Sequence, residues 1–211
     1  MSTSVFTLAV GFLAQGFFSA RILVQWLLSE RARKVLSPSV FWILSLAGSY
    51  LLCFYGWLRD DFSIVLGQFL SYYIYMWNLK IKGVMRHVPV CLKAVLMLTP
   101  VAALLFIVLN DDDVAVRFLH NADIPLWLLV WGSVGQVVFT MRFVYQWLYS
   151  RRAGESRLPA GFWLMSLIGS LAIVSYGVVR RDLVLVVGQS FGVVAYIRNL
   201  MLMKKEFKNV G

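Results

Sequence analysis

The chain has 211 residues, of which 60% are hydrophobic and 14% charged, with two cysteines. This composition excludes an ordinary soluble globular protein and a disulfide-stapled secreted domain, and it is typical of an integral membrane protein. The net charge of +10 would suit a nucleic-acid-binding protein, but its distribution along the chain indicates membrane topology instead. The first apolar stretch lacks a basic segment before it and is too long for a cleavable signal peptide, so we expect it to be a span.

Seven stretches are apolar and long enough to cross a bilayer as helices. They lie at roughly 5–28, 40–58, 62–80, 89–109, 125–149, 161–179 and 183–203. Alternating the sides of the loops gives thirteen cations and three acids to the side that holds the C-terminus, and four cations and seven aspartates to the other. The positive-inside rule then predicts a cytosolic C-terminus and an outer N-terminus, with anionic lipids as neighbours and no nucleic acid partner.

The sequence repeats itself at a displacement of 121 residues, which aligns 11–79 with 132–200 without a gap. Of these 69 aligned pairs, 27 are identical, and many of the identical residues are polar. Each repeat holds three spans, so the unmatched fourth span restores the orientation of the second repeat. We therefore predict an all-α membrane protein in a 3+1+3 arrangement, with a first three-helix repeat at 1–82, a linker helix and outer loop at 83–124, and a second three-helix repeat at 125–211.

The second and sixth spans share the phrase FW..SL.GS, in which Ser45, Gly48 and Ser49 recur as Ser166, Gly169 and Ser170. Small residues at this spacing let helix backbones approach closely inside a membrane. Helix packing is the favoured interpretation, and a direct substrate role is the alternative.

The composite motif G…Q…R…QW, P..FW..SL.GS, YG..R.D and GQ……Y..NL resembles the lipid-A-disaccharide synthase N-terminal domain family in a tandem-repeat form. The resemblance covers both repeats. It implies kinship with the PQ-loop, SWEET and SemiSWEET three-helix-bundle transporters, a bacterial inner-membrane location and work on envelope glycolipids. The Pro-Gln dipeptide of PQ-loop proteins is replaced by Val24-Gln25 and Tyr145-Gln146, so the first helix of each repeat should lack the proline kink that some relatives use for gating.

Two arginines, Arg21 and Arg142, lie well inside the first and fifth spans. One interpretation is that each side chain extends to the cytosolic surface and anchors its helix. The other is a phosphate site, because a guanidinium offers forked donors and a glutamine follows each arginine four residues later on the same helix face. The second interpretation is favoured, and the predicted substrate-binding residues on these spans are Arg21, Gln15 and Gln25 with their counterparts Arg142, Gln136 and Gln146.

A second polar set lies on one face of the third span and recurs on the seventh. It comprises Gln68, Tyr75 and Asn78, repeated as Gln189, Tyr196 and Asn199. Such a face should contact a neighbouring helix through hydrogen bonds or border a substrate cavity. Arg198 replaces Trp77 beside Asn199, which indicates either an asymmetric head-group site or an interface anchor.

Other polar residues carry no assigned chemistry. Arg59 with Asp61 and Arg180 with Asp182 are interpreted as pairs at helix N-termini, and Asp111–Asp113 as a solvated outer loop. Cys53, Cys91, His87 and His120 show no metal-ligand spacing. We expect no metal, no cofactor and no catalytic residues, because the longest non-membrane segment is too short for a nucleotide-sugar-binding domain.

The favoured function is an inner-membrane transporter that flips a lipid-linked sugar or polyprenyl phosphate for modification of lipid A or another surface glycan. Its partners would be that amphiphilic substrate, membrane lipids and a membrane glycosyltransferase. A SWEET-like small-sugar uniporter is the first alternative, favoured by the two asparagines and opposed by the two arginines. A non-transporting membrane subunit of a lipid A biosynthesis enzyme is the second.

Overall fold

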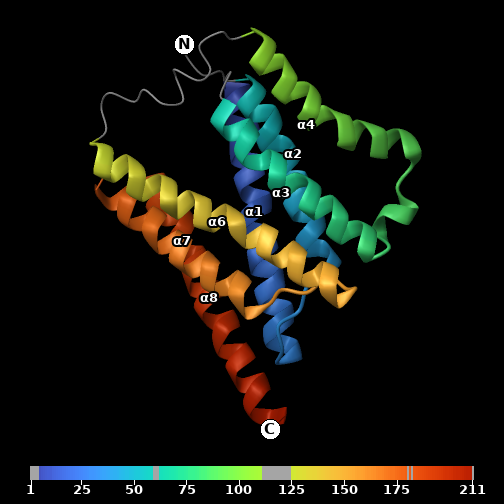
Figure 1. Cartoon of the computed structure of the whole chain (residues 1–211), viewed down its shortest axis with the longest axis vertical. Helices are drawn as coiled ribbons and strands as arrows, with labels where there is room; N and C mark the ends of the chain where they lie inside the picture. The colour runs from blue at the N-terminus through green and yellow to red at the C-terminus, as the bar shows by residue number, and fades with distance from the viewer. Residues whose placement is uncertain (1–4, 59–61, 111–124, 180, 182, 211) are drawn as a thin grey trace. The chain divides into compact units, whose positions relative to one another are not determined.

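The structure is a computed structural model that describes residues 5–58, 62–110, 125–179, 181 and 183–210. These residues form seven α-helices and one short 3-10 helix, which confirms the all-α fold class (Figure 1). The helices are α1 (Val5–Ala32), α2 (Ser39–Leu58), α3 (Phe62–Ile81), η1 (Val84–His87), α4 (Val90–Asn110), α6 (Leu126–Ala153), α7 (Ala160–Val179) and α8 (Leu183–Val210). The predicted Arg59–Asp61 and Arg180–Asp182 pairs and the Asp111–Asp113 loop lie outside the described residues.

Each predicted span coincides with one helix, but α1, α6 and α8 extend beyond the apolar segments to 28 residues each. The last turns of α1 and α6 contain charged residues and alanine, which favour helix as well as the apolar residues do. The backbone reaches the left-handed region at equivalent positions after α1 and α6, at Arg33 (φ 53°) and Gly154 (φ 70°). A glycine accepts this conformation without the steric cost that the arginine bears.

Within the part of the chain that the structure describes, two helices, α1 and α7, are long and apolar enough to cross a bilayer, and α2 and α4 contain the shorter apolar stretches Ser39–Tyr55 and Val90–Phe106. Length and composition alone are weak support for a membrane, because core helices of soluble proteins and signal sequences share them.

The contacts divide the chain into two compact units. Unit 1 comprises 1–21 and 39–122, and unit 2 comprises 22–38 and 123–211, so α1 contributes to both. In unit 1, α2 packs against α3 and both contact α4; in unit 2, α7 packs against α6 and α8 (Figure 1).

Small residues mark the tightest helix contacts, as predicted. A Cβ atom added to Gly169 of α7 would lie 2.9 Å from both the backbone N and the Cα of Phe139 on α6. In unit 1 a Cβ on Gly48 would lie 3.0 Å from the Phe18 ring and 3.2 Å from the Ala14 carbonyl oxygen. The serines that flank these glycines are completely buried. The shared phrase therefore has the packing role that the sequence indicated.

The end of α1 is held to the second repeat within unit 2 by an ion pair. Arg198 Nη2 of α8 donates to Glu30 Oε2 over 3.0 Å, and Arg198 Nε donates to Glu30 Oε1. The hydrogen bond from Arg198 is the main reason that the pKa of the Glu30 carboxyl is lowered. In the repeat alignment Glu30 corresponds to Arg151 and Arg198 corresponds to Trp77, and these two residues cannot form an ion pair. Arg198 is thus engaged in an interhelical contact, and its assignment to a head-group site or to an interface anchor stays a prediction.

We expect Gly169→Ala to lower the free energy of unfolding by about 1–3 kcal/mol, because the backbone of Phe139 leaves no room for a methyl group. Gly16→Ala is the matched control, since a Cβ at Gly16 meets nothing within 4 Å and alanine favours helix by roughly 0.5–1 kcal/mol. Thermal unfolding of the purified variants measures both. Equal stability of the two variants would contradict the close contact.

We expect the Glu30–Arg198 pair to stabilise the protein in a pH-dependent manner. Because the pKa of Glu30 is lower in the folded state than the ordinary value of 4.5, the stabilisation is present above pH 4.5 and is lost as the pH falls through the folded pKa. Unfolding curves of wild type and Glu30→Gln should therefore differ at neutral pH and converge in acid. A difference that is constant with pH would exclude this carboxylate as the cause.

Candidate functional site

Arg21 is buried in unit 1, where α1, α2 and α3 each supply a residue to its surroundings. Arg21 is only 6% exposed. Arg21 Nη1 donates to Ser45 Oγ at 3.0 Å and to Tyr75 Oη at 3.2 Å, and its Cζ lies 4.6 Å from the centroid of the Phe18 ring. The Ser45 hydroxyl donates its own hydrogen bond to the Phe41 carbonyl at 2.6 Å, which leaves its oxygen as an acceptor for the guanidinium.

Arg142 is buried in unit 2 and is only 3% exposed. Its Cζ lies 3.3 Å from the centroid of the Phe139 ring, with Phe143 at 4.7 Å and Phe162 at 5.7 Å. Phe139 occupies the repeat position of Phe18, and Ser166 donates to the Phe162 carbonyl at 2.6 Å as Ser45 does to Phe41. The negative faces of the rings stabilise the cation electrostatically. Both arginines therefore lie in the protein interior, which favours the interior interpretation over the surface-anchor interpretation.

Gln25 and Gln146 connect a helix end to the loop that follows. Gln25 Nε2 donates to Ser29 Oγ at 2.9 Å and to the Leu36 carbonyl at 3.3 Å. Gln146 Nε2 repeats this with Ser150 Oγ at 2.8 Å and the Arg157 carbonyl at 3.0 Å. Each serine oxygen also accepts the backbone N–H of the loop residue at 3.0 Å. These amide hydrogens are engaged by the fold, so we assign the glutamines to the structure that supports the arginines rather than to anion contact.

Asn199 joins the two repeats within unit 2. Its Oδ1 accepts from Gln25 Nε2 at 2.8 Å and its Nδ2 donates to Gln25 Oε1 at 3.2 Å, although the residues are 174 positions apart. Both side chains are completely buried, so the reciprocal amide pair satisfies groups that would be costly to leave unmet. Asn199 Nδ2 also donates to the Ala195 carbonyl at 2.9 Å, as Asn78 does to Ile74.

The polar face of α3 and α8 makes interhelical hydrogen bonds, one of the two predicted outcomes. Ser49 donates to Gln68 Oε1 at 3.0 Å, and Ser170 donates to Gln189 Oε1 at 2.8 Å. Tyr196, like Tyr75, is buried, and its ring centroid lies 5.9 Å from that of Trp163. Gln15 and Gln136 are exposed on α1 and α6, and their assignment to substrate stays a prediction.

The structure brings in residues that the sequence reasoning did not single out, chiefly Phe18 and Phe139 beneath the arginines and Ser29 and Ser150 beside the glutamines. All four are identical between the repeats, so the alignment of the repeats carried the signal. Among the described residues there is no group of three or more metal-ligating side chains, and the free cysteines Cys53 and Cys91 are buried and exposed respectively.

Curated relatives are similar to this chain over most of its length. The chain is 29% identical over 204 residues to a lipid-A-disaccharide synthase of Chlamydia pneumoniae, 29% over 206 residues to that of Chlamydia felis and 28% over 211 residues to that of Chlamydia trachomatis serovar D. Each alignment covers 93% of this chain but only 33–34% of the relative, so the chain spans about a third of the length of these proteins. No solved structure gives a significant match.

The two repeats themselves match one family. Residues 10–80 and 131–201 each match the Lipid A Biosynthesis N-terminal domain, and together they cover most of the chain and contain both buried arginines. The chain therefore belongs to the Lipid A Biosynthesis N-terminal domain family and carries two copies of its domain.

Proposed function

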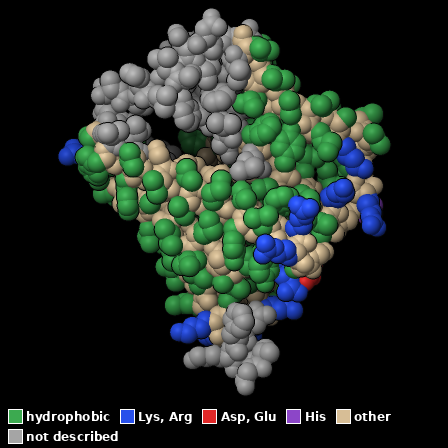
Figure 2. Space-filling view, viewed as in Figure 1, with side chains coloured by type: hydrophobic (Ala, Val, Ile, Leu, Met, Phe, Trp, Pro, Cys, Tyr) green, Lys and Arg blue, Asp and Glu red, His purple; other side chains and the backbone are tan. Residues whose placement is uncertain are grey.

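We propose that the chain is a multi-pass protein of a bacterial inner membrane with seven spans, an outer N-terminus and a cytosolic C-terminus. Charge asymmetry supports this orientation, and exposed apolar side chains support the contact with lipid. On α7, Leu164, Ile168 and Leu171 follow one helix face and are each about half exposed. Figure 2 shows that hydrophobic side chains cover most of the described surface on one face.

We further propose that the protein moves an amphiphile that bears a phosphate group, such as a polyprenyl phosphate-linked sugar, between the leaflets. The observation that carries this proposal is the duplicated, buried guanidinium at Arg21 and Arg142. A cation is costly to bury in an apolar bundle, and its retention at both repeat positions is best explained by a use for its charge. Forked N–H donors match phosphate oxygens, and the rings around the arginines suit isoprenoid or sugar surfaces.

The neighbours of Arg21 are suited to exchange. Ser45 and Tyr75 are neutral hydroxyls, and a phosphate would be a stronger acceptor for the same guanidinium hydrogens. Tyr75 Oη would then turn from acceptor to donor toward the phosphate. The fixed Gln–Ser connections at the helix ends would hold the arginines in place while the two repeats alternate access, as in the transporters that the motif resembles.

A second candidate is a non-transporting membrane subunit that positions a lipid A glycosyltransferase. The comparisons favour it, because the relatives named as lipid-A-disaccharide synthases carry this segment as one third of a longer protein. The small-sugar uniporter is less well supported, since Asn78 and Asn199, its favoured ligands, donate to helix carbonyls and Asn199 also pairs with Gln25.

Replacement of both arginines by glutamine separates these functions. In proteoliposomes, we expect Arg21→Gln with Arg142→Gln to slow flipping of a fluorescent polyprenyl phosphate-linked sugar by about tenfold or more, because charge-assisted hydrogen bonds to the phosphate are lost. Arg151→Gln, which removes an exposed cation, should leave flipping unchanged. Lysine at both positions should restore part of the activity, because the charge returns without the fork.

Uptake of free sugar is measured in parallel, and thermal unfolding verifies that each variant is folded. Loss of sugar uptake with intact flipping would support the uniporter instead. Indifference of a folded double variant in both assays would exclude transport at these arginines and leave the membrane subunit.

The orientation can be tested with the native cysteines. The proposed topology places Cys91, which is exposed near the start of α4, on the cytosolic side, whereas Cys53 is buried. A membrane-impermeant maleimide should therefore label the protein only after the cells are permeabilised. A cysteine in place of Val179, at the outer end of α7, should be labelled in intact cells that carry Cys91→Ser. Labelling of Cys91 in intact cells would reverse the orientation.

A further inference from the structure

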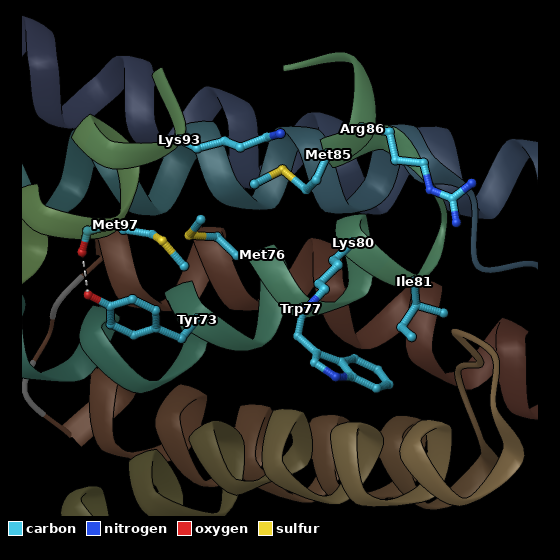
Figure 3. Close-up of a pocket in the computed structure, with 9 residues that line it drawn as sticks. All are labelled: Tyr73, Met76, Trp77, Lys80, Ile81, Met85, Arg86, Lys93 and Met97. Atoms are coloured by element: carbon cyan, nitrogen blue, oxygen red, sulfur yellow. Dashed lines mark hydrogen bonds between the residues drawn. The ribbon is translucent and has the colours of Figure 1, made fainter. Parts of the chain in front are cut away.

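A pocket of about 670 Å³ lies within unit 1, where α3, η1 and α4 meet (Figure 3). Its lining combines aromatic rings, thioethers and cations, and comprises Tyr73, Met76, Trp77, Lys80, Ile81, Met85, Arg86, Lys93 and Met97. In Figure 3, Met85 lies between Lys93 and Arg86, while Trp77 and Met76 extend along α3 beneath them. The pocket is thus apolar along its walls and cationic where η1 and the start of α4 border it.

A proline inside α4 accounts for one of the bonds that attach α4 to α3. Pro100 in α4 has no N–H, so the Leu96 carbonyl, four residues earlier, loses its helical donor. Tyr72 Oη of α3 donates to that carbonyl at 2.8 Å, and Tyr73 Oη donates to the next one, Met97, at 2.8 Å. These two bonds attach α4 to α3 at the apolar end of the pocket, and they explain why consecutive tyrosines stand at 72 and 73.

The repeat does not preserve this pocket. The counterparts of Tyr73, Trp77 and Lys80 are Val194, Arg198 and Met201, and neither η1 nor α4 has a counterpart. Several residues at the close helix contacts, such as Ser45 and Gly48, are identical between the repeats, whereas these differ in size and charge. The lining has therefore been set by something other than the common three-helix packing.

We propose that this pocket binds an anionic phospholipid from the cytosolic leaflet, with its head group near the cations Lys80, Arg86 and Lys93 and the first part of an acyl chain along Met76, Trp77 and Met97. Among the nine lining residues three are cations and none is acidic, which complements an anionic head group. Thioethers and an interfacial tryptophan adapt to a flexible chain, which a water-soluble anion would not need. The proposal rests on the proposed membrane placement but not on transport.

The test uses the full chain in micelles of a neutral detergent and phosphatidylglycerol brominated on its acyl chains, which quenches a nearby tryptophan. We expect saturable quenching that is weaker with brominated phosphatidylcholine and reduced in Trp77→Phe. Lys80→Gln with Arg86→Gln and Lys93→Gln should weaken the apparent affinity for phosphatidylglycerol by about tenfold or more. Arg151→Gln with Arg152→Gln and Lys204→Gln is the matched control, because it removes the same charge from exposed positions outside the pocket.

Equal loss in the pocket variant and the control would overturn the site, because the preference would then follow net charge alone. Full competition by glycerol phosphate would also overturn it, because that result indicates a site for a soluble anion. Thermal unfolding should be the same for both triple variants, since Lys80 and Arg86 are exposed. The pocket variant should still flip the lipid-linked sugar, and Arg21→Gln with Arg142→Gln should still prefer phosphatidylglycerol, so the two proposals fail separately.

Discussion

A guanidinium can be buried among helices only where the protein surrounds it with acceptors and electron-rich faces, and this constraint organises the centre of both repeats. Around Arg21 the acceptors and the electron-rich face are the Ser45 hydroxyl, the Tyr75 hydroxyl and the Phe18 ring, which come from three different helices. Ser45 can accept from the guanidinium because its own hydroxyl hydrogen is directed to the Phe41 carbonyl. The small serines and glycines of FW..SL.GS therefore have two consequences: they bring the helices close together, and they leave an oxygen facing the arginine.

The two repeats share a scaffold and differ in charge. The Ser–Gln bonds, the Gln–Ser connection to the loop and the aromatic ring beneath the arginine recur at equivalent positions. By contrast, the Glu30–Arg198 pair has Arg151 and Trp77 at its counterparts, so only one of the two arrangements can be an ion pair. The duplicated fold therefore carries an unequal distribution of charge, and the ion pair ties the end of α1 to α8 at one of the two equivalent places only.

The sequence was sufficient for the helices and their order, because each apolar stretch exceeds the length needed for a stable helix and the repeat fixes its boundaries twice. It also identified Gly48 and Gly169 as packing residues and Arg21 and Arg142 as unusual. It could not assign the partners of the amides: Gln25 is one turn from Arg21, but its hydrogen bonds go to Ser29, Leu36 and Asn199. Helical spacing places residues on a face, whereas the choice among nearby acceptors depends on the packing of segments far apart in sequence. The 3-10 helix η1 was missed because four residues carry no periodic signal.

Identity between repeats is consequently an ambiguous guide to function, because a buried amide pair and a substrate ligand are both retained by duplication. Asn199 and Gln146 illustrate this, since each recurs and each has its hydrogen bonds within the fold. Asymmetry is more discriminating. At the positions of Lys80 and Trp77 the second repeat has methionine and arginine, so the three-helix scaffold that the repeats share does not itself require the cation and the ring found in the first repeat. The arginines differ from the amides in cost, because a charged side chain is more expensive to bury than a neutral amide that makes its hydrogen bonds within the fold.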